Sequence, residues 1–351
     1  MKKICIVGAG IFGTTLSLIL SENKRIKIDL YERNKDILNE TSLKNQQRFH
    51  LGYHYPRSKK TILEIKKSAV DFDKFFGKKF YGNTNNLYAI SKKKSKLNFV
   101  KYCKKLNYLG LKTIKHNSNL FSDLIENSIK TDEKILNYFK IKEFIRKKIK
   151  KSKNINLKLG KNILNENIDD YDKIIICTYS NNNNLLSKLG VKKSSLKIKR
   201  YELVEKIVVK LPKELKKTSV VILDGNFLNF DPFLTTNYHL LSVVKEAKIE
   251  IIKKRFPMFK SSEKKYLEYK FVKNLKKSNF KKFIELGEKF VPLLSKARYI
   301  KSAYVVRCVD ISKNNQNRSS SINQYGNKII SVFSGKWNNC VKISKQIKNL
   351  I

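Results

Sequence analysis

Histidine, arginine and tyrosine side chains are dense in one short segment of the sequence, from Arg48 to Ser58. Its eleven residues hold two of the chain's four histidines, two arginines and two tyrosines. A histidine can take up a proton at neutral pH, and an arginine can pair with a carboxylate through two parallel hydrogen bonds. The segment has neither helical nor strand periodicity, and Gly52 and Pro56 favour a loop. We therefore expect a functional loop here, in preference to a surface loop whose aromatic side chains pack locally.

A phosphate-binding turn is predicted at the N-terminus, where an apolar run ends in the pattern Gly8-x-Gly10-x-x-Gly13. Gly8 permits a tight turn, Gly10 lets the backbone approach a pyrophosphate, and Gly13 lets the next helix pack against the strand. That helix, over residues 11–20, would offer free N–H groups at its start. A second strand ends at Glu32, 19 residues after Gly13, where a carboxylate can hold the ribose hydroxyl groups. The unit predicts a dinucleotide site, and the carboxylate disfavours the 2′-phosphate of NADP.

The same N-terminal run could instead be a signal peptide or a membrane span, because two lysines precede the apolar residues from Ile4 to Leu20. That run is short for a span and contains three glycines. No small-x-small cleavage site follows it. We therefore expect no transmembrane segment.

The composition indicates a folded chain that can bury a large core, with 351 residues of which 41% are apolar. This length favours two domains. The five cysteines are far apart and form no Cys-x-x-Cys pair, so the sequence predicts neither a metal site nor a disulfide framework. A reducing compartment, the cytoplasm, fits this pattern. The oligomeric state is left open.

The formal charge of +47 could indicate a nucleic acid or an anionic membrane as partner. The lysines, however, are spread over the whole chain beside many asparagines and isoleucines, and an A/T-rich genome would produce that composition. Lysine also greatly outnumbers arginine, the residue that phosphate-reading surfaces prefer. We favour the compositional explanation over a nucleic-acid surface.

Further along the chain, residues 171–178 form an apolar strand of the kind found in buried parallel sheets. Residues 201–211 alternate as in an antiparallel strand, and more strands follow up to residue 244, with a hairpin turn at Asp224-Gly225. A strand over 328–333, a turn and a closing helix from Trp337 repeat the N-terminal pattern. We also expect a short helix within 34–40, a helix that opens at Thr131-Asp132-Glu133 and buries Phe139, and helices over 261–295.

These elements predict an α/β fold, α+β overall, with a Rossmann-like nucleotide domain assembled from separated segments and a second domain built on an antiparallel sheet. The predicted nucleotide domain comprises residues 1–78, 145–195 and 297–351. The predicted substrate domain comprises residues 79–144 and 196–296.

At this point the sequence resembles the D-amino-acid-oxidase-like family of FAD-dependent oxidoreductases over most of its length. The N-terminal turn with Glu32 matches the family's FAD fingerprint, and Thr41, Ser42 and Asn45 resemble its second flavin-contacting turn. Residues 50–55 are similar to the His-x-Gly-x-Tyr-Tyr run of the L-2-hydroxyglutarate oxidase branch. Residues 171–178 resemble the strand that ends in Ala-Thr-Gly, and residues 331–336 the last flavin-binding turn.

The resemblance implies bound FAD, held by a set of residues drawn from all of these segments: Gly8, Gly10, Ile11, Phe12, Gly13, Glu32, Arg33, Thr41, Ser42, Asn45, His50, Ile163, Thr178, Ser334, Gly335, Lys336 and Trp337. His50 is also a minor candidate for covalent attachment of the flavin. Three departures from the family pattern stand out. Tyr179 replaces the glycine of Ala-Thr-Gly, Arg307-Cys308 replaces Arg-Pro, and residues 53–55 differ from the hydroxyglutarate branch.

The family's chemistry is hydride transfer to the flavin, here from a CH–OH or CH–NH group of a small anionic substrate. An alcohol needs a base for its hydroxyl proton, so the two histidines favour a hydroxy compound. The predicted catalytic residues are His50, His54, Tyr53 and Arg307, and the predicted substrate contacts are Tyr55, Arg57 and Arg307. Arg48 is an alternative carboxylate clamp, and the other cations are expected in solvent. Three rival functions stay open: a flavin-dependent mutase or isomerase acting on a sugar nucleotide, an RNA-binding or RNA-modifying flavoprotein, and a nucleotide-binding protein without catalysis.

Overall fold

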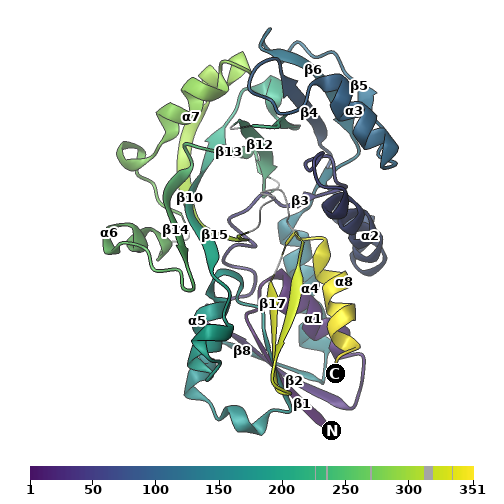
Figure 1. The fold of residues 1–351 in the computed structure, drawn as a ribbon, viewed down its shortest axis with the longest axis vertical. Coiled ribbons are helices and arrows are strands. Elements are labelled where there is room, and N and C mark those ends of the chain that lie inside the picture. Colours follow the sequence, from purple (N-terminus) through teal and green to yellow (C-terminus); the bar gives the residue numbers. More distant parts are fainter. Residues whose placement is uncertain (226, 235, 269–270, 312–318, 334) are drawn as a thin grey trace.

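The computed structural model describes residues 1–225, 227–234, 236–268, 271–311, 319–333 and 335–351. Two sheets form the centre of the molecule, one in the lower half of Figure 1 and one in the upper half. The N-terminal strand and the C-terminal helix both belong to the lower half. The short strand β3 (Arg48–Phe49) lies between the two halves.

Within the described residues, the lower sheet has six strands in the order β16-β17-β9-β1-β2-β8. All neighbouring pairs are parallel except β16 with β17. The strands are β1 (Lys2–Val7), β2 (Ile26–Glu32), β8 (Ile155–Leu159), β9 (Lys173–Ile176), β16 (Ser321–Tyr325) and β17 (Ile329–Phe333). Segments from the start, middle and end of the chain thus share one sheet, as the sequence predicts.

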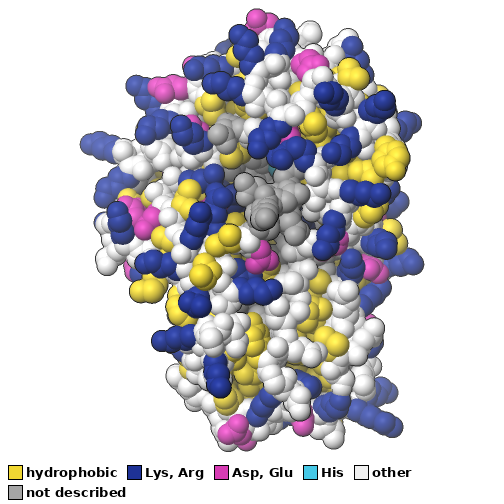
Figure 2. All heavy atoms as spheres, in the orientation of Figure 1, with side chains coloured by type: hydrophobic (Ala, Val, Ile, Leu, Met, Phe, Trp, Pro, Cys, Tyr) yellow, Lys and Arg dark blue, Asp and Glu magenta, His cyan; other side chains and the backbone are white. Residues whose placement is uncertain are grey.

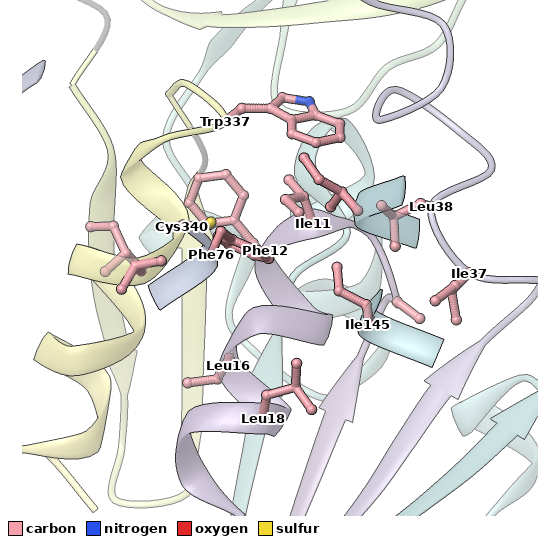
Figure 3. Close-up of a cluster of buried hydrophobic side chains, with 14 of the residues drawn as sticks. Ile11, Phe12, Leu16, Leu18, Ile37, Leu38, Phe76, Ile145, Trp337 and Cys340 are labelled. Atoms are coloured by element: carbon pink, nitrogen blue, oxygen red, sulfur yellow. The ribbon is translucent and has the colours of Figure 1, made fainter. Parts of the chain in front are cut away.

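Both faces of this sheet are buried, because successive strand side chains point in opposite directions. Ile4 and Ile6 face the cluster that includes helices α1 (Ile11–Leu20), α4 (Tyr138–Lys151) and α8 (Asn339–Lys348). Figure 3 shows that cluster, with Trp337 above Ile11 and Phe12. Cys5 and Val7 face the other way, toward a cluster that includes residues of α5 (Asn182–Lys188). Packing on both faces of the sheet fixes where the ends of β1, β2 and β9 lie.

The upper sheet contains nine strands among the described residues, and all its pairs are antiparallel except β4 with β11. Its longest members, β10 (Lys199–Lys210) and β15 (Arg298–Asp310), pair along nearly their whole length. The other strands are β4 (Asn85–Ser91), β5 (Ile114–Lys115), β6 (Ile125–Thr131), β11 (Thr218–Leu223), β12 (Leu228–Phe233), β13 (Tyr238–Val243) and β14 (Lys248–Lys254).

The remaining helices are α2 (Lys59–Phe76), α3 (Phe99–Tyr108), α6 (Ser261–Lys264) and α7 (Phe280–Gly287). Helix α2 buries the apolar stripe that its sequence predicts, and Ser58 caps it by accepting a hydrogen bond from the Thr61 N–H. Short 3-10 turns lie at Lys78–Phe80, Ile163–Asn165, Ile168–Asp170, Tyr179–Asn181, Lys193–Ser195, Lys213–Leu215, Lys265–Leu267, Leu275–Lys277 and Pro292–Lys296.

The predicted short helix within 34–40 is wrong, and the helices predicted over 261–295 are shorter than expected. Residues 34–40 contain bends and turns, in which Glu32 and Asp36 accept hydrogen bonds from the backbone of Asn34 and Ile37. These local bonds from carboxylates compete with helical ones. Residues 261–295 contain only the short helices α6 and α7 and three 3-10 turns among the described residues.

The expected helix at Thr131-Asp132-Glu133 is also wrong. As a result, the sequence does not predict that Glu133 lies close to His50. Thr131 ends β6, and β7 (Lys134–Ile135) follows and pairs with β3. Helix α4 begins only at Tyr138, where the Asn137 side chain accepts from the Lys140 N–H. The buried stripe of α4 contains Tyr138, Ile141, Ile145 and Ile149, and Phe139 is exposed.

His239 lies on β13, with its ring edge-on to Phe230, and it is buried in the sheet. Burial lowers the pKa of His239 to about 4, well below the value near 6.5 of an unfolded chain. The unfolded state therefore binds the extra proton between these values, so this residue removes stability as the pH falls from 6.5 toward 4. The contribution reaches about 3 kcal/mol at most.

We expect His239→Leu to lose less stability than the wild type between pH 7.5 and pH 4.5, because leucine has no proton to bind. Urea denaturation of both proteins at the two pH values measures the difference. Parallel losses in the two proteins would contradict the assignment.

Candidate functional site

The N-terminal glycine turn has the geometry that the sequence predicts, at the carboxyl end of β1. Gly8 has φ of +101°, and a side chain there would lie 2.8 Å from the Cys177 carbonyl oxygen. A side chain at Gly13 would lie 1.9 Å from the Gly8 carbonyl oxygen. Helix α1 begins after Gly10 without a side-chain cap from that residue. The turn thus packs closely against the backbone around Cys177, and the N–H groups at the start of α1 follow it directly.

Two oxygen-bearing side chains hold the turn from either side. Glu32 Oε2 accepts a hydrogen bond from the Ala9 N–H at 2.9 Å, and its Oε1 accepts two from Asn34. Ser42 Oγ accepts from the Ile11 N–H at 3.2 Å. Both side chains are buried. The predicted acid and the predicted second turn therefore meet the glycine turn directly.

Three other predicted cofactor contacts, Ile163, Arg33 and Thr41, differ in how far they are buried near the glycine turn. The backbone of 160–161 hydrogen-bonds to the carbonyls of Asn34 and Glu32, which brings the nearby Ile163 beside the end of β2. The Ile163 side chain is buried on the far face of the sheet. Arg33 is exposed and pairs with Glu40 at 3.3 Å. Thr41 is half-buried and adjoins Ser42.

Thr178 and Tyr179 follow β9 next to the glycine turn. The Thr178 methyl group would be 3.3 Å from a side chain at Gly8, and its hydroxyl donates to Asn182 Oδ1. Tyr179, where the sequence resemblance leads to an expected glycine, has a left-handed backbone with φ of 55°, which glycine adopts more readily. Its hydroxyl accepts from the Cys308 N–H and bonds to the Cys308 carbonyl, both at 3.0 Å. These two hydrogen bonds connect the turn after β9 to β15 at Cys308, the residue next to Arg307.

The C-terminal turn reaches the same region from β17. Ser334 lies outside the described residues. The Gly335 N–H donates to Ser320 Oγ at 2.9 Å, and the Lys336 ammonium lies over the Tyr55 ring at 4.9 Å from its centre. Trp337 is buried against α1, as Figure 3 shows. The Oδ1 atoms of Asn338 and Asn339 are buried without a hydrogen-bond partner among the described residues.

The His50 to Arg57 segment is a loop of turns whose side chains are largely buried. The His50 ring lies 6.1 Å from the rings of both His54 and Tyr55, and its carbonyl oxygen accepts from Asn338 Nδ2. Burial, then the positive charges of Lys336, Arg48 and His54, lower the pKa of His50 well below its ordinary value. His50 is therefore a neutral imidazole near pH 7, the form that can accept a proton.

Two predicted residues of this loop have structural partners. The Tyr53 hydroxyl donates to the Lys112 carbonyl, and burial raises the pKa of Tyr53 to about 12. Arg57 pairs with both oxygens of Asp224, at 2.6 and 3.2 Å. The alternative clamp Arg48 is not a solvated cation. It is buried and pairs with Glu133 and Asp231.

Arg307 lies on β15 opposite Glu202 of β10, and its side chain is 41% exposed. Its Nη2 pairs with Glu202 Oε2 at 2.5 Å, while Nε is buried without a partner among the described residues. Arg200 contacts the same carboxylate from the other side. Arg307 therefore keeps donor capacity for an added anion.

Lys206 lies on β10, on the same strand as Glu202. The sequence does not predict it as a site residue. Its ammonium donates to Asn45 Oδ1 at 2.6 Å and to Gln46 Oε1 at 2.5 Å, which joins the upper sheet to the loop after Ser42. Burial, then the charges of Arg307 and Lys336, lower the pKa of Lys206 to about 7, although Asp231 opposes them. Nothing in the local pattern separates this lysine from the many others on strands.

Lys206, Arg307 and Lys336 form what we call the cationic group, because each charge affects the others or His50. Elsewhere the basic side chains are spread over the surface, and on the face in Figure 2 they show no single concentration. Exceptions to the expected solvation are Lys44, Lys142 and Lys199, which are buried. The described residues contain no cluster of metal ligands and no helix long and apolar enough to cross a membrane.

No protein-family model matches this sequence, and the search of curated proteins gives no match. Solved structures do match along the whole chain. The chain is similar to L-proline dehydrogenase from P. horikoshii, with a TM-score of 0.71, 12% identity, and coverage of 99% of this chain and 92% of that one. It is similar to L-alpha-glycerophosphate oxidase from Mycoplasma pneumoniae with FAD bound, with a TM-score of 0.69, 13% identity, and coverage of 100% and 95%.

Glycine oxidase from Geobacillus kaustophilus gives a TM-score of 0.67 at 11% identity, with coverage of 100% of this chain and 94% of that one. At these identities the likeness concerns the fold. The protein therefore has the D-amino-acid-oxidase-like fold, a Rossmann-like α/β unit joined to a larger mixed sheet.

Proposed function

We propose that the protein is an FAD-dependent oxidoreductase that oxidises a CH–OH or CH–NH group of a small anionic substrate. The similar solved structures are described as oxidases and dehydrogenases, one of them with FAD bound, and this supports the proposal. The five free cysteines suit a reducing compartment such as the cytoplasm. The domain division given above stays part of the proposal, although β15 of segment 297–351 pairs with β10 of the upper sheet.

The residues present fit FAD in three respects. Helix α1 begins at the glycine turn with only its Ile11 N–H bonded to Ser42, and Glu32 is held beside the turn, where it could bind a ribose. The second turn, through Ser42 and Asn45, connects that region to the upper sheet. The Oδ1 atoms of Asn338 and Asn339, at the start of α8, are buried and have no hydrogen-bond partner within the part of the chain that the structure describes. These groups would hold the phosphates and the ring system of the cofactor.

The bound flavin would supply hydride acceptance, and the surrounding side chains would prepare the substrate. His50 is neutral and can take the hydroxyl proton of an alcohol. Arg307 can bind a carboxylate or phosphate through paired donors. Lys336 adds positive charge, and Lys206, whose pKa is lowered to about 7, can carry or release a proton near neutral pH. The observation that carries the proposal is this juxtaposition of a neutral histidine and the cationic group near the N-terminal glycine turn.

An absorption spectrum of the purified protein, before and after acid precipitation, tests the cofactor. A flavin spectrum released into the supernatant is expected, whereas a yellow pellet would indicate a covalent bond, with His50 the first residue to mutate. A colourless protein that takes up no added FAD would overturn the proposal. Anaerobic mixing with L-2-hydroxyglutarate, glycerol phosphate, glycine and proline then tests the substrate class through bleaching of the flavin.

Arg307→Ala should raise the KM for an acidic substrate by about 100-fold, since a charge-assisted bidentate contact contributes about 3 kcal/mol. The flavin spectrum should persist. Arg298→Ala, at the exposed end of the same strand, is the matched control and should keep the wild-type KM. Unchanged kinetics of Arg307→Ala with the best acidic substrate would remove that role.

A further inference from the structure

The Glu133 carboxylate lies at the centre of a buried polar cluster next to His50. Its Oε1 accepts hydrogen bonds from the N–H groups of Leu51 at 2.7 Å and Gly52 at 3.3 Å. Its Oε2 accepts from the Tyr88 hydroxyl at 2.5 Å. The side chain is fully buried. Glu133 thus fixes the backbone of the two residues that follow His50.

Arg48 balances this buried charge from the same loop. Its Nη1 is 3.3 Å from Glu133 Oε2, and its Nη2 pairs with Asp231 and Ser219. Pairing of β3 with β7 brings Arg48 close to Glu133, the residue that immediately precedes β7. Four neighbours therefore hold Glu133 in one orientation, so the direction in which its Oε2 lone pairs point is set before any substrate binds.

One more atom faces that oxygen, the His50 Nδ1 at 3.8 Å. This nitrogen is buried and has no hydrogen-bond partner among the described residues. The separation is about 1 Å longer than a hydrogen bond, and catalytic hydrogen bonds are often long before substrate binds. Since a carboxylate can only accept, its charge favours the tautomer in which the facing nitrogen carries the ring's proton. The other nitrogen, Nε2, is then left with its lone pair.

We propose that Glu133 is a positioning residue that holds His50 in the tautomer protonated on Nδ1, so that Nε2 is the base. This inference rests on the proposed function for its chemical use. Nε2 would take the hydroxyl proton of an alcohol, and a bound flavin would accept the hydride that the alcohol loses as it becomes a carbonyl compound. The imidazolium produced keeps its Nδ1 proton toward Glu133, whose negative charge stabilises it.

The tautomer can be measured directly, without a substrate. The full chain, labelled with ¹⁵N-histidine, is studied with and without FAD at pH 7.5 by long-range ¹H–¹⁵N correlation spectra, which distinguish protonated from bare ring nitrogens. His50→Gln identifies the His50 signals among the four histidines. In the wild type we expect a protonated Nδ1 and a bare Nε2. A bare Nδ1, or a charged ring at this pH, would overturn the proposal.

Glu133→Gln tests the cause. All the groups around Glu133 are donors, and an amide offers one oxygen and one NH₂ group, so the NH₂ must face some of them. We expect the His50 proton to move wholly or partly to Nε2. Glu205→Gln is the matched control, another buried carboxylate that accepts from Ser278, Ser302 and the Asn279 N–H on the upper sheet. It should leave the His50 signals unchanged.

An unchanged Nδ1–H signal in folded Glu133→Gln would contradict the positioning role. The wild-type spectrum remains decisive where that variant does not fold. Loss of the proposed function would instead appear as failure to bind FAD, which leaves the tautomer measurement intact. The two ideas can therefore fail separately.

Discussion

Gly13→Ala is expected to abolish FAD binding and to lower the free energy of unfolding by about 3 kcal/mol or more. The added carbon would lie 1.9 Å from the Gly8 carbonyl oxygen, a backbone atom that cannot rotate away. To relieve this contact, helix α1 would have to move away from β1. Residues of both elements pack in the same buried cluster, so the movement would disrupt that packing. That movement would also displace the N–H groups at the helix start. Urea denaturation and a flavin fluorescence titration measure the two effects.

Gly10→Ala provides the comparison within the same turn. A side chain there meets only Ser42 Oγ, at 3.5 Å, which is ordinary contact. We expect this variant to fold with near-wild-type stability and to bind FAD more weakly, because the backbone at Gly10 is where a pyrophosphate approaches. Equal stability of Gly13→Ala and Gly10→Ala would show that the close contact at Gly13 is not what requires glycine.

Arg48→Met should lower the free energy of unfolding by about 3–5 kcal/mol, the usual result of removing one partner from a buried ion pair. Methionine fills a similar volume but leaves the carboxylates of Glu133 and Asp231 buried without their cation. Both carboxylates keep hydrogen bonds, from Tyr88 and from Ser219, so charge rather than unmade hydrogen bonds dominates the loss. Chemical denaturation of the FAD-free protein isolates this effect from cofactor binding.

Arg146→Met is the control for the substitution itself. Arg146 pairs with Asp36 at 2.5 Å, but its side chain is exposed, and exposed ion pairs contribute about 1 kcal/mol at most. A loss in Arg48→Met no larger than in Arg146→Met would mean that the Glu133 cluster is hydrated in solution. His50 would then lack the rigid surroundings that the positioning role of Glu133 needs.

The sequence predicts the features whose causes are local. The glycine turn, the strand before it and the helix after it depend on neighbouring residues, and their geometry agrees with the pattern. Period-two alternation identifies β10, and a 3.6-residue period identifies α2. The departure at Tyr179 is also visible in the sequence, as a tyrosine where a glycine is expected.

Local signals fail where a polar residue has a distant partner. Thr131-Asp132-Glu133 has the composition of a helix start, yet it joins β6 to β7 because β7 pairs with β3, some eighty residues earlier. That pairing brings Arg48, Glu133 and His50 together and keeps Arg48 from the surface. The contact of Lys206 with Asn45 and Gln46 likewise joins segments 160 residues apart. Burial and electrostatic partners arise only when distant segments pack together. The sequence alone therefore determines the glycine turn, and the tertiary structure decides which charged side chains surround His50.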